Sequence, residues 1–310
     1  MRAGRSRARP LSAAASGPGL SATARGMLWM VATGVLFTVL NATMKKLSEQ
    51  LDPWVVGWLR NSLGAALMLL TVLRHGPARL APRRHGLQLL RGALHAAGLV
   101  CWFAALPSVS LPELTAIGFT APLFICLGAV LLLGERMTGE RWAAVLLGFG
   151  GVMLVVRPWS ARGFDGVSSG TLLMLLSTPL FAGSFLAAKA LTRHEHLDVI
   201  VLWQHLWISV LLLPFAASAW TMPSAAQWGL LVLCAFLGTA GHYCTTRAFK
   251  VADISAVQSV KFLDLVWAAM LGLAVFGTVP SGWTVAGGAL ILASTLWLAR
   301  REAHAVRRAA

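Results

Sequence analysis

Long apolar runs alternate with short polar segments along almost the whole chain. Ten of these runs reach the length of about 18 residues that a helix needs to cross a hydrocarbon core ~30 Å thick. Strands that span a membrane are about half as long and alternate in polarity, so the runs predict helices. The expected spans are residues 26–44, 53–73, 86–106, 112–133, 138–156, 168–190, 197–220, 224–248, 254–277 and 281–299.

Composition narrows the class of protein. Hydrophobic residues make up 57% of the 310 residues and charged residues only 12%, and the mean hydropathy is +0.72. Soluble domains are about a quarter charged, so a soluble enzyme, a disordered chain and a collagen-like chain are all excluded. The sequence predicts an all-α integral membrane protein with ten transmembrane helices, and the lipid bilayer is its expected surroundings.

The two ends of the chain differ from the spans. Residues 1–25 hold five arginines among Ser, Ala, Gly and Pro without apolar periodicity, which predicts a disordered basic cytoplasmic tail. The apolar run that follows is as long as a span and lacks a convincing cleavage site, so it is kept as the first span. Residues 302–310 are expected to form a second cytoplasmic tail.

The net charge of +15 is spread in short clusters between the spans. A nucleic-acid-binding protein instead gathers Lys and Arg on one face of a soluble core, so no nucleic acid is expected as a partner. With the N-terminus inside, 19 of the 26 Lys and Arg residues fall on the cytoplasmic side, which predicts that both termini are cytoplasmic. The others are Lys45, Lys46, Arg157 and Arg162 on the opposite side, and Arg60, Arg91 and Lys261 within spans.

The chain repeats itself weakly at an offset of 143–144 residues. Each copy holds five spans, and an odd number of spans inserts the second copy upside down relative to the first. Inverted repeats of this kind are typical of transporters, in which the two halves enclose a site near the bilayer midplane. Gly26, Phe37 and Lys45 recur as Gly170, Phe181 and Lys189; Gly98, Cys101 and Ala105 recur as Gly241, Cys244 and Ala248; Phe119 recurs as Phe262.

These repeated segments resemble the EamA repeat of the drug/metabolite transporter superfamily. The first copy has Phe119-Thr120-Ala121-Pro122, Gly134-Glu135-Arg136, Trp142 and the Gly148/Gly150/Gly151 run. The second has Thr246-Arg247-Ala248-Phe249, Ala252-Asp253, Phe276-Gly277 and Gly287-Gly288-Ala289-Leu290-Ile291.

The resemblance implies two five-helix repeats, at residues 26–158 and 168–301. It also implies a secondary carrier that moves a small organic metabolite across the bacterial inner membrane by alternating access, as a monomer or homodimer. Members include importers of S-adenosylmethionine or riboflavin type and exporters of amino acids or drugs, and the fold does not choose among them. The family often has Gly-Glu after each fourth helix; Glu135 keeps it and Thr278 replaces it in the second copy, so Glu135 is expected to be structural.

Ionisable residues inside spans are candidate functional groups, because a charge at the bilayer centre is costly. Lys261 and Asp264 lie three residues apart on one face of the ninth span. One interpretation is that they neutralise each other and hold the helix against a neighbour. The other is a switchable pair in which Asp264 takes a proton or meets a cationic substrate, which makes protons a candidate coupling ion.

Two arginines inside spans have different expected roles. Arg60, beside Asn61, is too deep in the second span to reach the outer surface, so it is expected to face a cavity or a carboxylate of Asp264 or Glu113. It is a candidate contact for an anionic group. Arg91 lies five residues into the third span and is expected to extend toward the cytoplasmic headgroups.

Aromatic and hydrogen-bonding residues also gather inside spans. Flat walls and a few placed donors suit an aromatic or heterocyclic substrate, whereas tryptophans near span ends belong to the interfacial aromatic belt. The candidate substrate-binding residues are Arg60, Asn61, His95, Trp203, Gln204, His205, His242, Tyr243, Lys261, Asp264 and Trp267.

Other classes of function lack their motifs. The sequence has no HExxH and no acidic metal cluster for a membrane-embedded enzyme, no P-loop for ATP-driven transport and no filter sequence for a channel. The four cysteines all lie in apolar runs, without CxxC or metal-ligand spacing. Neither a cofactor nor a metal is therefore expected.

Overall fold

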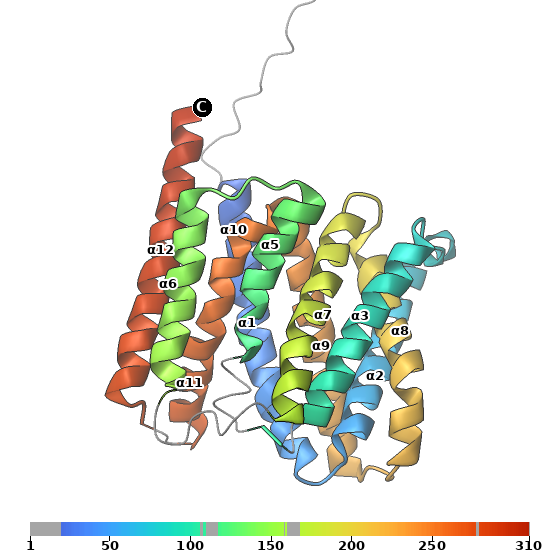
Figure 1. Cartoon of the computed structure of the whole chain (residues 1–310). Coiled ribbons are helices and arrows are strands. Elements are labelled where there is room, and N and C mark those ends of the chain that lie inside the picture. The colour runs from blue at the N-terminus through green and yellow to red at the C-terminus, as the bar shows by residue number, and fades with distance from the viewer. Residues whose placement is uncertain are drawn as a thin grey trace, which may run out of the picture.

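The chain folds into a bundle of helices (Figure 1). The computed structural model describes residues 20–105, 108–109, 117–157, 159, 168–276 and 279–309, and within these every regular element is helical. Nine segments there are long and apolar enough to cross a membrane, and α5 is a shorter apolar helix, which confirms the predicted ten-helix membrane fold. Glu113 and Thr278 lie outside the described residues.

The helices follow the predicted spans closely. They are α1 (Ala22–Ser48), α2 (Pro53–Arg74), α3 (His85–Ala105), α5 (Ala121–Leu133), α6 (Gly139–Val156), α7 (Ser169–Leu191), α8 (Leu197–Ser218), α9 (Ala225–Val251), α10 (Ile254–Val257), α11 (Leu263–Phe276) and α12 (Gly282–Ala309), with the 3-10 helices η1 (Pro77–Leu80) and η2 (Gln258–Phe262).

Capping residues and helix continuation explain where the boundaries differ from expectation. Ser21 accepts a hydrogen bond from the backbone N–H of Ala24 at 3.1 Å, so α1 begins at Ala22, inside the segment expected to be a disordered tail. Residues 1–19 lie outside the described part of the chain. At the other end, α12 continues to Ala309, so most of the expected tail at 302–310 is helical.

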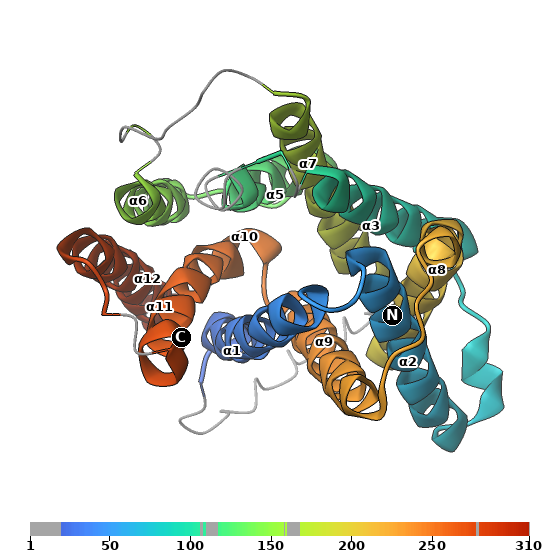
Figure 2. The ribbon, with the colours of Figure 1, turned by 90° about the horizontal axis from the view of Figure 1, so that it is seen from below.

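The helix pairings show the inverted repeat directly. Helix α1 of the first half packs on α9 of the second, and the repeat-related pair, α7 of the second half and α3 of the first, packs in the same way. Two further pairs, α6 with α12 and α2 with α8, join equivalent helices of the two halves (Figure 2). Gly98 lies against the ring of Phe181, and its counterpart Gly241 lies against Phe37, so the residues that define the repeat make equivalent contacts.

Most of the basic residues at helix ends lie on one face of the bundle. There α2, α5, α7, α9 and α12 end and α3, α6 and α8 begin, at the top of Figure 1. We call this the basic face; Arg74, Arg84, Arg136 and Arg193 lie on it. The charge bias predicts that it is cytoplasmic, and the orientation stays a prediction.

Glu135 and Lys189 hold the junction between α9 and α10 at the basic face. The Glu135 carboxylate accepts hydrogen bonds from the backbone N–H groups of Ile254 at 2.9 Å and Ser255 at 3.1 Å, where α10 begins. The Lys189 Nζ donates to the carbonyl oxygens of Phe249 at 2.7 Å and Ala252 at 2.6 Å, where α9 ends. Both charges therefore complement the helix end that they contact, and Glu135 has a structural role.

Arg141 joins the two halves beside that junction. Its Nη1 lies 3.1 Å from Asp253 Oδ2 and its Nε lies 2.8 Å from Glu302 Oε1. Arg141 belongs to the first half and both acids belong to the second. We refer to Glu135, Arg141, Lys189, Asp253 and Glu302 together as the basic-face network.

Glycines bring α6 and α12 into backbone contact. A Cβ atom added to Gly151 would lie 2.8 Å from the carbonyl oxygen of Gly287, and one added to Gly287 would lie 2.5 Å from that of Gly151. A real Cβ cannot approach an oxygen so closely, so only glycine fits at either position. Gly150, in the same run, faces open space instead.

Candidate functional site

Two of the ten spans are interrupted at equivalent positions. In the fourth span, residues 117–118 are helical, 119–120 form a turn and α5 begins at Ala121. The ninth span consists of α10, η2 and α11. Both were expected to be single helices, 112–133 and 254–277, and Pro122 lies in the first turn of α5 instead of kinking a continuous helix.

The two interruptions meet inside the bundle. Phe119 and Phe262 correspond at the repeat offset, and their rings stack with centroids 6.1 Å apart at 27°. A contact between two equivalent residues lies on the pseudo-two-fold axis that relates the halves. Broken helices at matching positions of inverted repeats are where transporters build their substrate sites.

A cavity of about 300 Å³ lies beside the interruptions. Its size is at the lower end of the ~300–1,000 Å³ typical of small-molecule sites, and its wall is mainly apolar with a few polar groups, as such sites are. Five aromatic rings line it: Phe37, Trp102, Phe119, Phe185 and Phe249. The polar lining residues are Asn41, Thr245, Gln258, Lys261 and Asp264.

Lys261 and Asp264 form the charged part of the cavity wall. The Lys261 Nζ lies 2.5 Å from Asp264 Oδ2 and 5.4 Å from the centroid of the Phe37 ring, within cation–π range. Asp264 Oδ1 and Trp267 Nε1 are both buried without a hydrogen-bond partner among the described residues, and both lie against Gly34. An acceptor and a donor are thus left free next to the ion pair.

Three histidines form a second, fully buried group behind Phe37. The Phe37 ring packs edge-on against His242 at 5.2 Å, and His242 lies 5.4 Å from His95 and 5.6 Å from His205 between ring centroids. We call these three residues the histidine cluster. Polar side chains on α2, α7, α8 and α9 lie within hydrogen-bond distance of the cluster.

Hydrogen bonds hold two of the three rings of the histidine cluster, those of His95 and His205. His205 Nδ1 lies 2.9 Å from Asn61 Oδ1, and its Nε2 lies 3.3 Å from the hydroxyl of Thr239. His95 Nδ1 lies 3.4 Å from the amide nitrogen of Gln204. The structure therefore brings the predicted residues Asn61, His95, Gln204, His205 and His242 together, but outside the cavity.

The two buried arginines have different surroundings. Arg60 is 7% exposed and forms no ion pair with a described carboxylate; Asp264, one of its two expected partners, pairs with Lys261, and the other, Glu113, lies outside the described residues. Arg91 is 1% exposed and donates to the carbonyl of Ile200 at 2.8 Å and to the side-chain oxygen of Gln204. The expectation that Arg91 extends to the headgroups is wrong, because its face of α3 packs against α8.

Two predicted residues lie away from both groups. Trp203 donates from Nε1 to the carbonyl of Leu80 in η1 at 3.0 Å. Trp203 and Tyr243 both pack against an apolar group that includes Met68 and Leu202. Their environment is that of side chains that brace α2, α8 and α9.

Sequence reasoning missed several lining residues. Asn41 and Gln258 are neutral polar residues inside apolar runs, and that polarity was the available signal. Trp102 lies three residues from the end of α3, where a tryptophan resembles a belt residue. Phe119 was noticed only as a repeat position.

Comparison with known families decides the class of protein. Residues 24–157 and 168–300 each match the EamA-like transporter family. The chain belongs to the EamA-like transporter family. It is therefore a multi-pass membrane transporter and not an enzyme, and the two matched segments coincide with the two inverted halves.

Several relatives share almost the full length. A riboflavin transporter from Rhizobium johnstonii is 34% identical over 92% of this chain and 94% of its own. A pseudopaline exporter from Pseudomonas aeruginosa is 28% identical, over 89% and 96%. An S-adenosylmethionine uptake transporter from Rickettsia felis is 25% identical, over 91% and 95%. A solved crystal structure that is 20% identical superposes with a TM-score of 0.77 over 89% of this chain and 98% of its own, which shows the fold.

Proposed function

We propose that this EamA-family carrier imports a planar heterocyclic metabolite of the flavin class, with riboflavin as the first candidate, across the bacterial inner membrane by alternating access. The observation that carries the proposal is the aromatic cavity at the paired helix interruptions. The relative named as a riboflavin transporter supports this choice of substrate.

The cavity wall matches the chemistry of such a ring system. A flavin ring is flat and apolar on its faces, and it carries hydrogen-bond donors and acceptors along one edge. Trp102, Phe119 and Phe249 offer aromatic surfaces for its faces. Asn41 and Gln258 offer amide groups for its polar edge. Riboflavin itself is uncharged, so it needs no counter-ion from the Lys261–Asp264 pair.

The positions of the lining residues support entry from the face opposite the basic face. Trp102 is near the end of α3 and Met174 is near the start of α7, both toward that opposite face. The basic-face network links the two halves at the other end of the bundle. In this proposal the network breaks when the cavity opens toward the basic face.

A second candidate is export of an amino-acid-like zwitterion. The Lys261–Asp264 pair supports it, because an ammonium and a carboxylate 2.5 Å apart match the two charges of such a substrate. The pseudopaline-exporting relative is the comparison that favours this reading. The two candidates make opposite predictions for a competition experiment.

Uptake into proteoliposomes tests the proposal. We expect radiolabelled riboflavin to accumulate, with competition from excess unlabelled riboflavin and none from amino acids or S-adenosylmethionine. Trp102→Ala should raise the KM roughly fivefold, because a lost aromatic contact costs about 1 kcal/mol. Trp297→Ala, on the exposed face of α12, is the matched control and should change nothing.

The competition pattern decides between the candidates. Transport of radiolabelled amino acids, with no uptake of riboflavin, would reject the flavin proposal in favour of the zwitterion. Equal effects of Trp102→Ala and Trp297→Ala on the KM would show that the aromatic cavity does not hold the substrate.

A further inference from the structure

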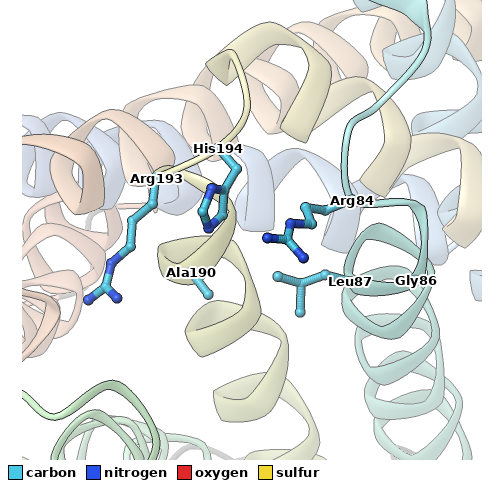
Figure 3. Close-up of a pocket in the computed structure, with 6 residues that line it drawn as sticks. All are labelled: Arg84, Gly86, Leu87, Ala190, Arg193 and His194. Carbon is cyan, nitrogen blue, oxygen red and sulfur yellow. The ribbon is translucent and has the colours of Figure 1, made fainter.

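A cleft opens on the basic face where α3 begins and α7 ends. It has a volume of about 430 Å³ and is lined by Arg84, Gly86, Leu87, Ala190, Arg193 and His194. In Figure 3 the side chains of Arg84 and His194 turn toward each other across the cleft, with Leu87 and Ala190 below them. Arg193 extends along the other side of α7.

The inverted repeat contains the same junction a second time, on the opposite face. There α1 ends and α9 begins, and the Gln227 amide nitrogen donates directly to the Gln50 side-chain oxygen at 3.0 Å. At the repeat offsets of 143 and 144, Gln227 corresponds to Arg84 and Gln50 corresponds to His194. One copy of the junction is therefore closed by an amide–amide hydrogen bond.

The other copy is not closed in that way. Within the described chain no hydrogen bond joins the side chains of Arg84 and His194, although the guanidinium carries several donors. No described carboxylate forms an ion pair with Arg84 or Arg193. Glu195 is buried, and its carboxylate accepts a hydrogen bond from the backbone N–H of Arg84 at 2.8 Å. The cleft thus presents a guanidinium on one side and an imidazole on the other, and no described carboxylate pairs with the guanidinium.

We propose that this cleft binds the phosphate group of an anionic phospholipid, which bridges α3 and α7 in place of the Gln50–Gln227 hydrogen bond. A phosphate offers several strong acceptors to Arg84 and His194 at once, with Arg193 adding charge. The cleft lies at the helix ends, at the depth of lipid headgroups, and basic pockets at this depth between transmembrane helices suit such lipids.

The wall below the cleft favours a lipid over a soluble phosphate. Leu87 and Ala190 form its apolar floor. Leu90, one helical turn further along α3, is 50% exposed and continues an apolar surface toward the membrane interior. An acyl chain can follow that surface while the phosphate stays in the cleft.

Lipid binding is measured on the full chain in nanodiscs of phosphatidylcholine, with and without phosphatidylglycerol. We expect phosphatidylglycerol to raise the Tm of the wild type and to remain bound in native mass spectrometry. Arg84→Gln should reduce the retained lipid at least fivefold and abolish the Tm shift. Arg83→Gln, at the exposed neighbouring residue that does not line the cleft, should keep both.

A double variant distinguishes loss of the lipid site from misfolding of the chain. Arg84→Gln combined with His194→Gln restores the amide pair of the other junction, so it should be as stable in pure phosphatidylcholine as the wild type is with phosphatidylglycerol. Equal loss of lipid in Arg83→Gln and Arg84→Gln would overturn the site. If inorganic phosphate shifts the Tm as much as phosphatidylglycerol does, the cleft binds a soluble phosphate, and the proposal of a lipid is wrong.

Discussion

The ammonium of Lys261 lies 2.5 Å from the carboxylate of Asp264, and both groups face the same cavity. The pair sits where the ninth span changes from η2 to α11, next to the Phe119–Phe262 contact. An ion pair at this place can hold the broken helix together, take part in transport, or do both. Variants separate these roles.

Asp264→Asn and Lys261→Met should each lower both the Tm and uptake. The side chains are about a fifth exposed, so we expect a cost of about 2 kcal/mol, below the ~3–5 kcal/mol of a fully buried pair. The double variant removes both charges and should recover the Tm. Uptake that stays low in the double variant assigns the pair to transport, whereas normal uptake in Asp264→Asn would make it purely structural.

Arg60 and Arg91 should respond in opposite ways to replacement by methionine. Arg91→Met leaves the side-chain oxygen of Gln204 and the carbonyl of Ile200 without their donor, so we expect a loss of about 1–3 kcal/mol. Arg60 forms no hydrogen bond or ion pair with the described residues, and Arg60→Met should keep or raise the Tm because it removes a buried charge. Thermal unfolding in detergent compares the two; a similar loss in both variants contradicts the prediction.

Glu135→Gln should destabilise the chain more than a similar change at the surface. The Glu135 carboxylate accepts three hydrogen bonds from Ile254 and Ser255 at the start of α10, and a neutral amide replaces one acceptor by a donor. We expect a loss of about 1–3 kcal/mol. Glu140→Gln is the control, because the Glu140–Arg301 pair is half exposed and contributes below about 1 kcal/mol.

If the basic-face network closes one end of the bundle, Glu135→Gln should also make that end more accessible to solvent. A single cysteine placed at Ser255 in a background without the native cysteines should then react faster with a membrane-impermeant maleimide. An unchanged labelling rate, with the expected loss of Tm, would leave Glu135 as a helix cap that does not control access.

Gly151→Ala should force α6 and α12 apart. The added methyl group would lie 2.8 Å from the carbonyl oxygen of Gly287, and such overpacking costs about 1–3 kcal/mol. Gly150→Ala, one residue earlier with open space around it, should stabilise α6 by up to about 1 kcal/mol through helix propensity. Denaturation midpoints of the two variants should therefore move in opposite directions, and parallel shifts would exclude the proposed contact.

The sequence predicted the architecture because membrane spans obey simple physical limits. Run length anticipated the bundle of spans, and the odd number of spans per repeat anticipated its inverted halves. The interruptions near Phe119 and Phe262 were not predicted, because run length and mean hydropathy do not reveal whether the backbone within a span is α-helical throughout. The proline at 122 marked the right place without revealing that the helix begins there.

The site was predictable only in part, for a geometric reason. Charge inside a span pointed to Lys261 and Asp264, and polar residues at middle depth pointed to the histidine cluster. Depth along a helix does not determine which neighbour a side chain faces, so Arg91 was misplaced and the histidines could not be separated from the cavity. Trp102 and Asn41 needed the helix pairings of α3 and α1 before their shared cavity was visible.

The contact between Gly151 and Gly287 limits how far the sequences of the two halves can diverge at these positions. Each glycine is confined by the backbone of its own repeat-related helix, so no side chain can relax to make room for a change at either position. The two copies of an internally duplicated protein are usually free to drift apart in sequence. At this crossing they are not, and we expect any descendant of the duplication that keeps the crossing to have a glycine on both helices.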